Sequence, residues 1–228
     1  MSASSSNPAK TVYVVPAPQD LSLDCDPAGP LWHKSIPVLF DGDNYGRTVP
    51  GMSTTVHSCW TASSLYLLFV CPYKELNLKP EPQMKTATPN LWQWDVAEIF
   101  IALDFGRIGS YKEFEISPQA EWIDLDIDLE APGRRGHREW SSGMQASARI
   151  DHAQSIWYGA MRIPFTAITA APVRAGARFR ANLFRSQGPQ HQLMAWQPSM
   201  SDTFHVPERF GSLVLLPSHQ AERSRPAK

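Results

Sequence analysis

Two tryptophans and a glutamate occupy alternate positions of one short segment, Trp92–Ile101 (WQWDVAEIFI). Its alternation and its β-branched and aromatic residues predict a strand that carries Trp92, Trp94 and Glu98 on one face. An indole can cover the C–H face of a pyranose ring, and a carboxylate can accept hydrogen bonds from its hydroxyl groups. The row therefore indicates a sugar-binding surface, although packing in a core is the commoner role of tryptophan.

Similar short segments recur along the chain, separated by turn residues every 8–12 positions, and no sustained helical stripe interrupts them. This pattern predicts an all-β fold, an antiparallel β-sandwich or a barrel, with one helical turn at 165–170. We expect strands at Thr11–Val15, Ile36–Phe40, Thr54–Trp60, Leu65–Cys71, Trp92–Ile101, Tyr111–Ser117, Trp122–Asp128, Ser147–Arg149, Ile156–Ile163, Arg178–Phe184, Leu193–Gln197 and Gly211–Leu216.

The domain organisation follows from the ends of this pattern. Residues 1–18 are expected to form an N-terminal arm, 19–216 a single domain and 217–228 a disordered tail. The 228 residues include 21 basic and 22 acidic side chains, a net charge of −1, and no basic stripe interleaved with aromatic residues. A nucleic-acid partner is therefore not expected. No apolar run reaches the ~20 residues of a membrane span, and no secretory signal is evident, which favours a cytoplasmic location.

Three cysteines, Cys25, Cys59 and Cys71, are too few and too irregularly spaced for a disulfide framework. A hairpin turning at 61–64 would set Cys59 opposite Tyr66, so we expect buried free thiols. Neither CxxC nor HExxH occurs, which argues against zinc. The alternating row Asp124, Asp126 and Asp128 offers oxygen ligands, but a single row is more typical of a solvated strand face than of a calcium cage.

Several segments together resemble family 9 carbohydrate-binding modules and their relatives in the wider DOMON-like group. The resemblance covers about residues 30–216 and includes Trp32 and WTASSLYLLF (Trp60–Phe69). It is carried by five segments in this order: DVAEIFI (Asp95–Ile101), YKEFEISPQAEWIDL (Tyr111–Leu125), IPF (Ile163–Phe165), NLFR (Asn182–Arg185) and FHVPERFGSL (Phe204–Leu213). FHVPERFG is the strongest of them. The resemblance implies a β-sandwich of immunoglobulin-like or jelly-roll type that binds a saccharide between two tryptophans.

Carried over residue by residue, the resemblance implies that Trp92 is the first stacking residue, with Trp94 beside it, and that Glu98 is the motif acid. Trp196 is the candidate for the second stacking tryptophan, and Arg185 would donate to ring hydroxyls. One departure is Ala160, which stands where the family usually has a glutamate. A structural calcium ion occurs in some relatives, but its ligands find no match in this sequence, so no cofactor is assigned.

Three functions remain open at this point. The first is non-catalytic carbohydrate binding, in support of glycoside hydrolysis and carbohydrate catabolism. The second is a haem-binding or electron-transfer domain of the DOMON type, for which Met52, Met194 and His205 offer axial ligands without a diagnostic spacing. The third is a glycoside hydrolase that uses Glu98 with Glu113 or Glu115 of a neighbouring strand. The sequence leaves the oligomeric state open.

Overall fold

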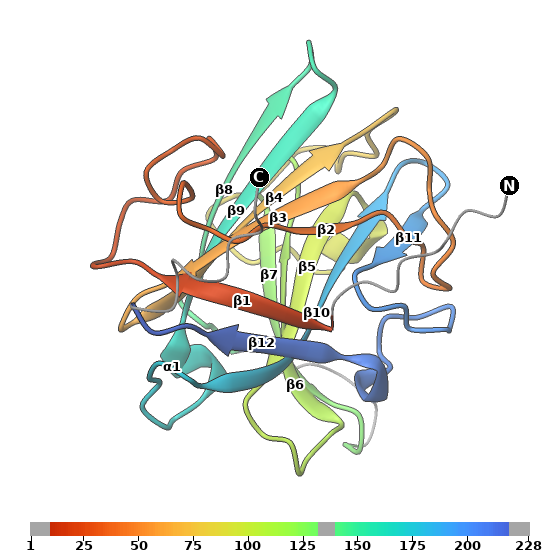
Figure 1. Ribbon diagram of the computed structural model, residues 1–228. Helices are drawn as coiled ribbons and strands as arrows, with labels where there is room; N and C mark the ends of the chain where they lie inside the picture. Colours follow the sequence, from red (N-terminus) through yellow and green to blue (C-terminus); the bar gives the residue numbers. More distant parts are fainter. Residues whose placement is uncertain (1–9, 132–139, 219–228) are drawn as a thin grey trace, which may run out of the picture.

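The computed structural model describes residues 10–131 and 140–218, which are nearly all β (Figure 1). Short helical turns occur at η1 (Leu91–Gln93), α1 (Phe165–Ile168) and η2 (Pro207–Arg209). The strands are β1 (Thr11–Pro16), β2 (Val38–Phe40), β3 (Thr54–Trp60), β4 (Ser64–Pro72), β5 (Val96–Ala102), β6 (Ser110–Ile116), β7 (Trp122–Asp128), β8 (Gln145–Asp151), β9 (Ile156–Pro164), β10 (Arg178–Gln187), β11 (Gln192–Ala195) and β12 (Gly211–Leu215).

All twelve strands are linked by hydrogen bonds in the order β7-β6-β5-β10-β12-β1-β3-β4-β9-β8, with β11 attached to β10 and β2 to β3. Strand β1 lies at the centre and pairs in parallel with both β12 and β3, although β1 and β12 come from opposite ends of the chain (Figure 1). The other pairs are antiparallel. The prediction of a wholly antiparallel fold is therefore wrong at β1, where hydrophobic alternation gave no information on strand direction.

The sheet curls over a single main core, so that strands from its two halves face each other. Ile116 of β6 lies against Gly159 of β9, where an added Cβ would come within 3.1 Å of the Ile116 side chain. Phe69, Ile99, Trp157 and Leu213 are among the fully buried members of this core. The result is a mixed, nearly closed sheet, and the description as a sandwich or jelly roll stays a prediction.

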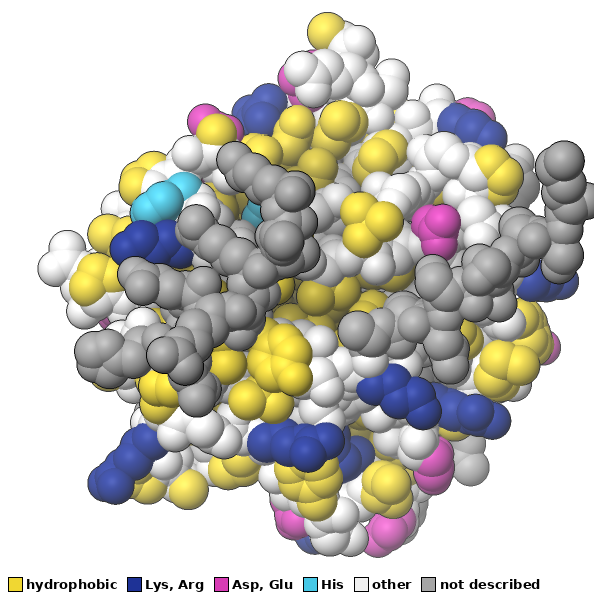
Figure 2. Space-filling model, in the orientation of Figure 1, with side chains coloured by type: hydrophobic (Ala, Val, Ile, Leu, Met, Phe, Trp, Pro, Cys, Tyr) yellow, Lys and Arg dark blue, Asp and Glu magenta, His cyan; other side chains and the backbone are white. Residues whose placement is uncertain are grey.

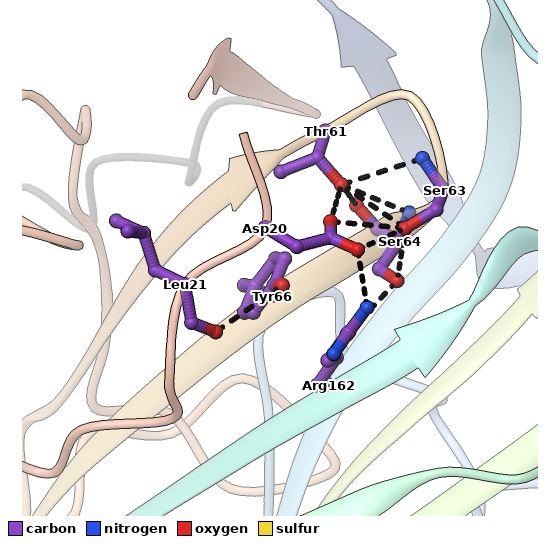
Figure 3. Close-up of polar contacts among 7 residues, drawn as sticks. All are labelled: Asp20, Leu21, Thr61, Ser63, Ser64, Tyr66 and Arg162. Atoms are coloured by element: carbon purple, nitrogen blue, oxygen red, sulfur yellow. Dashed lines mark hydrogen bonds and ion pairs between the residues drawn. The ribbon is translucent and has the colours of Figure 1, made fainter. Parts of the chain in front are cut away.

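A network of polar contacts fixes the segment after β1 to the rest of the sheet (Figure 3). Asp20 accepts hydrogen bonds from Thr61 and Ser63 in the β3–β4 turn and pairs with Arg162 of β9. Thr11–Pro16, expected as part of an arm, form β1 and thus belong to the sheet. Residues 1–9 of that arm and residues 219–228 of the expected tail lie outside the described residues.

The strand containing Glu98 begins later than its sequence pattern predicts. Residues Leu91–Gln93 form the turn η1, which starts after Asn90 in the left-handed conformation (φ 59°). The Asp95 N–H then donates to the carbonyl of Asn77, and β5 begins only at Val96. Trp92 and Trp94 therefore precede the strand, and the prediction that they share a strand face with Glu98 is wrong.

The cysteine predictions are confirmed in the described part of the chain. Cys59 lies opposite Tyr66 in the β3–β4 pair, and all three thiols are buried and free. On the face seen in Figure 2, Lys and Arg side chains lie as separate groups among hydrophobic side chains, with Asp or Glu side chains near several of them. Among the described residues, no helix has the length and apolar character needed to span a membrane.

Candidate functional site

A cavity of about 880 Å³ lies over the face of the sheet formed by β5, β6 and β7 and by the end of β10. Its floor follows from strand alternation, since alternate side chains share a face and cross-strand partners lie side by side. Glu98 and Phe100 come from β5, Glu113 from β6, and Leu125 and Ile127 from β7. The floor thus combines apolar side chains with the carboxyl groups of Glu98 and Glu113, and Asp124 of β7 and Ser186 of β10 add further polar atoms to the lining.

A third carboxyl group, that of Glu115, lies beside Glu98 on the neighbouring strand. Glu115 is the cross-strand partner of Glu98, and carboxylate oxygens of Glu98, Glu113 and Glu115 lie within 4.8 Å of one another. All three side chains are buried, at 3% exposure or less. Within the described residues, Glu98 Oε1, Glu113 Oε2 and both oxygens of Glu115 have no hydrogen-bond partner.

Burial raises the pKa of each of these carboxyl groups. It lifts the pKa of Glu113 to about 7 and the pKa values of Glu98 and Glu115 well above their ordinary range. The negative charge of a neighbouring glutamate adds to the rise for Glu98 and Glu115. The floor can therefore accept hydrogen bonds, share protons, or attract a cation.

One wall of the cavity carries an exposed tryptophan. Trp92 lies in η1 and is 39% exposed, although it lines the cavity together with Asn90 and His191. Leu91, its neighbour in η1, is fully buried and anchors this turn beside Val96 and Ile123. A large aromatic surface is thus held in a fixed position and left open to solvent.

The loop Asp202–His205 forms a second part of the lining. Tyr45 donates a 2.6 Å hydrogen bond to Asp202, and the Tyr111 hydroxyl lies 2.6 Å from His205 Nδ1. The Phe204 ring stacks on Phe184 of β10 at a centroid distance of 4.2 Å. These contacts give this loop a defined position.

The five site residues predicted from the sequence separate into two groups. Trp92 and Glu98 line the cavity, whereas Trp94 is half-buried and is not part of its lining. Trp196 is 2% exposed and belongs to the main core.

Arg185 lies opposite Ala97, and thus on the face of the sheet away from Glu98. Its guanidinium donates to Thr54 Oγ1 (3.2 Å) and to the carbonyl of Pro72 (2.6 Å). The structure therefore does not bring Arg185 or Trp196 to the cavity with Trp92 and Glu98.

The aspartate row of β7 is engaged by other groups. Asp124 is buried and accepts a 2.6 Å hydrogen bond from the Ser142 N–H, so the prediction of an outward side chain is wrong there. Asp126 pairs with Lys112 and Asp128 with Arg107. For the haem alternative, His205 lines the cavity while Met52 and Met194 lie in the main core, so neither methionine joins His205 in the cavity lining.

The acid cluster consists of the residues that the hydrolase alternative pairs, Glu98 with Glu113 or Glu115 of the neighbouring strand. The alternation of Tyr111, Glu113 and Glu115 predicts one shared face, but only the β5–β6 register sets Glu115 against Glu98. That register depends on the Ala102–Gly109 turn, which the sequence does not define closely enough.

Comparisons with known proteins agree with this fold. Residues 31–217 match the family described as carbohydrate family 9 binding domain-like. The chain is 23% identical over 191 residues to an Arthroderma benhamiae protein described as an extracellular protein, covering 76% of this chain and 85% of that one.

Two solved structures have the same fold at low identity. A Bacteroides uniformis protein provisionally described as carbohydrate-binding superposes with a TM-score of 0.72 at 14% identity, covering 90% of this chain and 98% of the other. A family 9 module from Caldicellulosiruptor kristjanssonii in complex with cellotriose gives 0.64 at 14% identity, covering 96% and 99%. Since the family match extends over most of the sequence, this chain belongs to the carbohydrate family 9 binding domain-like family.

Proposed function

We propose that this chain is a non-catalytic carbohydrate-binding domain and that the saccharide lies in the cavity against Trp92. The observation that carries the proposal is the combination of an exposed indole, Trp92, with the carboxyl groups of Glu98 and Glu113 in the lining of one cavity of about 880 Å³. This volume is typical of small-ligand sites, and the family membership gives the class of ligand.

The two parts of the site have complementary roles. Trp92 offers a flat apolar surface for the C–H face of a pyranose ring, in a turn that holds the ring open to solvent. Glu98 and Glu113 offer acceptors to hydroxyl groups from below, and Asn90 and His191 offer further polar atoms beside Trp92. A pyranose in the cavity would make hydrogen bonds to carboxyl groups that are largely removed from water, which is a source of specificity.

The first ligands to test are glucose and cello-oligosaccharides. The Caldicellulosiruptor kristjanssonii module has been solved with cellotriose and with glucose, and both ligands present the equatorial hydroxyls and flat C–H faces that an indole can cover. We further propose that binding supports the breakdown of the same saccharide by a separate glycoside hydrolase, so the ligand would indicate the class of that enzyme.

The test is a calorimetric and tryptophan-fluorescence titration of the purified chain with this panel. Binding is expected, and Trp92→Ala should weaken it at least ~10-fold without lowering Tm, because binding aromatics carry much interface energy while an exposed ring adds little stability. Tyr13→Ala is the matched control, since Tyr13 is 44% exposed but does not line the cavity.

Two results would overturn the proposal: no binding across the panel, or binding that Trp92→Ala leaves unchanged. Release of reducing ends during the titration would instead support the hydrolase alternative. Visible absorbance of the purified protein would support the haem alternative.

A further inference from the structure

We propose that the saccharide bound in the cavity is an amino sugar, whose ammonium group contacts the carboxyl groups of Glu98 and Glu113. This inference rests on the proposed saccharide binding and narrows it to one class of sugar. An ammonium group in place of a hydroxyl group makes the sugar a cation and leaves the flat C–H face that an indole can cover. The cavity combines an exposed indole, that of Trp92, with an acidic lining, and such a ligand needs both.

The lining of the cavity is acidic in the part of the chain that the structure describes. It contains no Lys or Arg side chain, and its titratable side chains are four acids and two histidines: Glu98, Glu113, Asp124, Asp202, His191 and His205. Burial lowers the pKa of His205, so this imidazole is uncharged near neutral pH, while His191 is exposed to solvent. The lining therefore favours a cationic ligand over an anionic one.

Glu98 and Glu113 differ from the other two acids of the lining in having no partner. Asp124 and Asp202 each accept a hydrogen bond from another part of the chain. Glu98 and Glu113 are only 2% and 3% exposed, yet neither forms an ion pair with a described Lys or Arg. Each also has an oxygen without a hydrogen-bond partner among the described residues. Because buried carboxyl groups are normally paired, these two indicate a ligand that brings a positive charge.

The spacing of the acid cluster suits a single ammonium group. Carboxyl oxygens of Glu98, Glu113 and Glu115 lie within 4.8 Å of one another. Charge-assisted N–H···O hydrogen bonds are about 2.7–2.9 Å long, so carboxyl groups spaced in this way can both contact one nitrogen. Glu98 Oε1 and Glu113 Oε2 are inaccessible to solvent, which leaves Glu98 Oε2 and Glu113 Oε1 for the ligand. Glu115 is not part of the lining and adds negative charge without direct contact.

An ammonium group should also change the protonation of this cluster. Burial raises the pKa of Glu113 to about 7 and the pKa values of Glu98 and Glu115 well above their ordinary range, so the empty cluster holds protons near neutral pH. A nearby positive charge favours the ionised carboxylates. Binding of an amino sugar should therefore release protons, whereas a neutral sugar should leave the cluster protonated.

The experiment compares sugars that differ in one kind of substituent. The purified chain is titrated calorimetrically near neutral pH with cellotriose, with the trisaccharide of glucosamine and with the trisaccharide of N-acetylglucosamine. The glucosamine trisaccharide should bind at least ~10-fold more tightly than cellotriose, because its hydrogen bonds to the carboxylates are charge-assisted. The N-acetyl trisaccharide is uncharged and should show no such gain. The binding heat of the glucosamine trisaccharide should also differ between buffers of low and high ionisation enthalpy, which measures the released protons.

Variants of the two glutamates locate the contact. Glu98→Gln and Glu113→Gln keep hydrogen-bonding atoms but remove the charge, so each should lower the ratio of the two affinities at least ~5-fold. Asp151→Asn is the matched control, because Asp151 pairs with Arg149 on β8 and does not line the cavity. It should leave the ratio unchanged.

Equal affinities for cellotriose and the glucosamine trisaccharide would overturn this inference and leave the proposed function intact. No binding of any of the three sugars would overturn both. A preference for the amino sugar that survives both glutamine variants would show that Glu98 and Glu113 do not hold the ammonium group. If neither variant folds, the wild type decides: buffer-dependent heat for the glucosamine trisaccharide alone supports the inference, and equal heats in the two buffers contradict it.

Discussion

The two faces of the sheet around β5 and β10 treat the same kinds of residue in opposite ways. On the interior face, Trp196 is packed in the main core and Arg185 donates to Thr54 and Pro72. On the cavity face, Trp92 is open to solvent and the carboxyl groups of Glu98 and Glu113 retain oxygens without a partner in the described residues.

This difference shows which residues stabilise the fold and which are available for a ligand. Packing a tryptophan and satisfying a charge both contribute to folding. Leaving an indole exposed and carboxylates unpaired costs stability, and such exceptions concentrate at functional sites. Substitutions on either face test whether interior residues stabilise the fold and cavity residues do not.

The largest effect is expected for Trp196→Ala on the interior face. Removing a buried indole leaves a cavity in the core, so the free energy of unfolding should fall by about 3–5 kcal/mol, as measured by urea denaturation. Trp92→Ala is the matched control and should stay within about 0.5 kcal/mol of the wild type. A stable Trp196→Ala variant that loses saccharide binding would instead place Trp196 in the ligand site.

Trp92 and Trp196 also show how much of the fold could be predicted from the sequence. The all-β class and most strands could be predicted, and β3 and β7 agree with their predicted bounds to the residue. The period of alternation defines a strand and its two faces, but not which face is covered by other strands. Trp92 and Trp196 are thus alike in sequence, and only the long-range packing of β10, β11 and β12 distinguishes them.

Glu98 and Arg185 illustrate the same limit for the site. Glu98 was correctly assigned to a strand, whereas the predicted strand Arg178–Phe184 stops one residue short of Arg185, which lies within β10. The β5–β10 register then sets Arg185 beside Ala97 and Phe184 beside Glu98. A shift by one residue would have placed the arginine on the cavity face. Opposite charges in two neighbouring strands therefore do not predict an ion pair until the register is known.

A pH effect of about 2–3 kcal/mol is expected from Asp95, which precedes β5 on the interior side. Burial raises its pKa to about 6, against the hydrogen bond from Gly188 and the charge of Arg185, which lower it. The pKa of Asp95 in the folded protein lies above its ordinary value of 3.8. The folded protein is therefore most stable below pH 3.8, with respect to this group, and loses that stability as pH rises through about 6 and the buried side chain becomes charged.

Asp95→Asn keeps an acceptor for the Gly188 N–H, which donates to Asp95 Oδ1 at 2.5 Å, and it removes the buried charge. Urea denaturation of both proteins between pH 4 and pH 8 measures the difference. The wild type should lose stability relative to the variant as pH rises, and parallel profiles would show that Asp95 does not titrate in this range.

Gly211→Ala tests the packing around Trp196 from the opposite side and should cost about 1–3 kcal/mol. An added Cβ would lie 2.5 Å from Trp196 Cη2 and 2.8 Å from the carbonyl of Lys10, so both the indole and β1 would have to move. Gly42→Ala is the control, because its nearest contact would be an ordinary 3.5 Å. Equal denaturation midpoints for the two variants would contradict tight packing of Trp196.

The smallest effect is expected for Asp20→Asn, at less than about 1 kcal/mol. Asp20, unlike the cavity glutamates, has polar and charged partners. Hydrogen bonds from Thr61 and Ser63 and the nearby charge of Arg162 lower its pKa despite some desolvation (Figure 3). The stability that ionised Asp20 contributes is present above its ordinary pKa and is lost as pH falls, the reverse of Asp95.

The expected loss of stability in Asp20→Asn is small because Asp20 and Arg162 are both partly exposed, and water already solvates both partners of the ion pair. A double-mutant cycle with Arg162→Met, read by thermal unfolding, measures their coupling. A coupling of several kcal/mol would mean that well-partnered surface acids, rather than the core face of the sheet, dominate the stability of this domain.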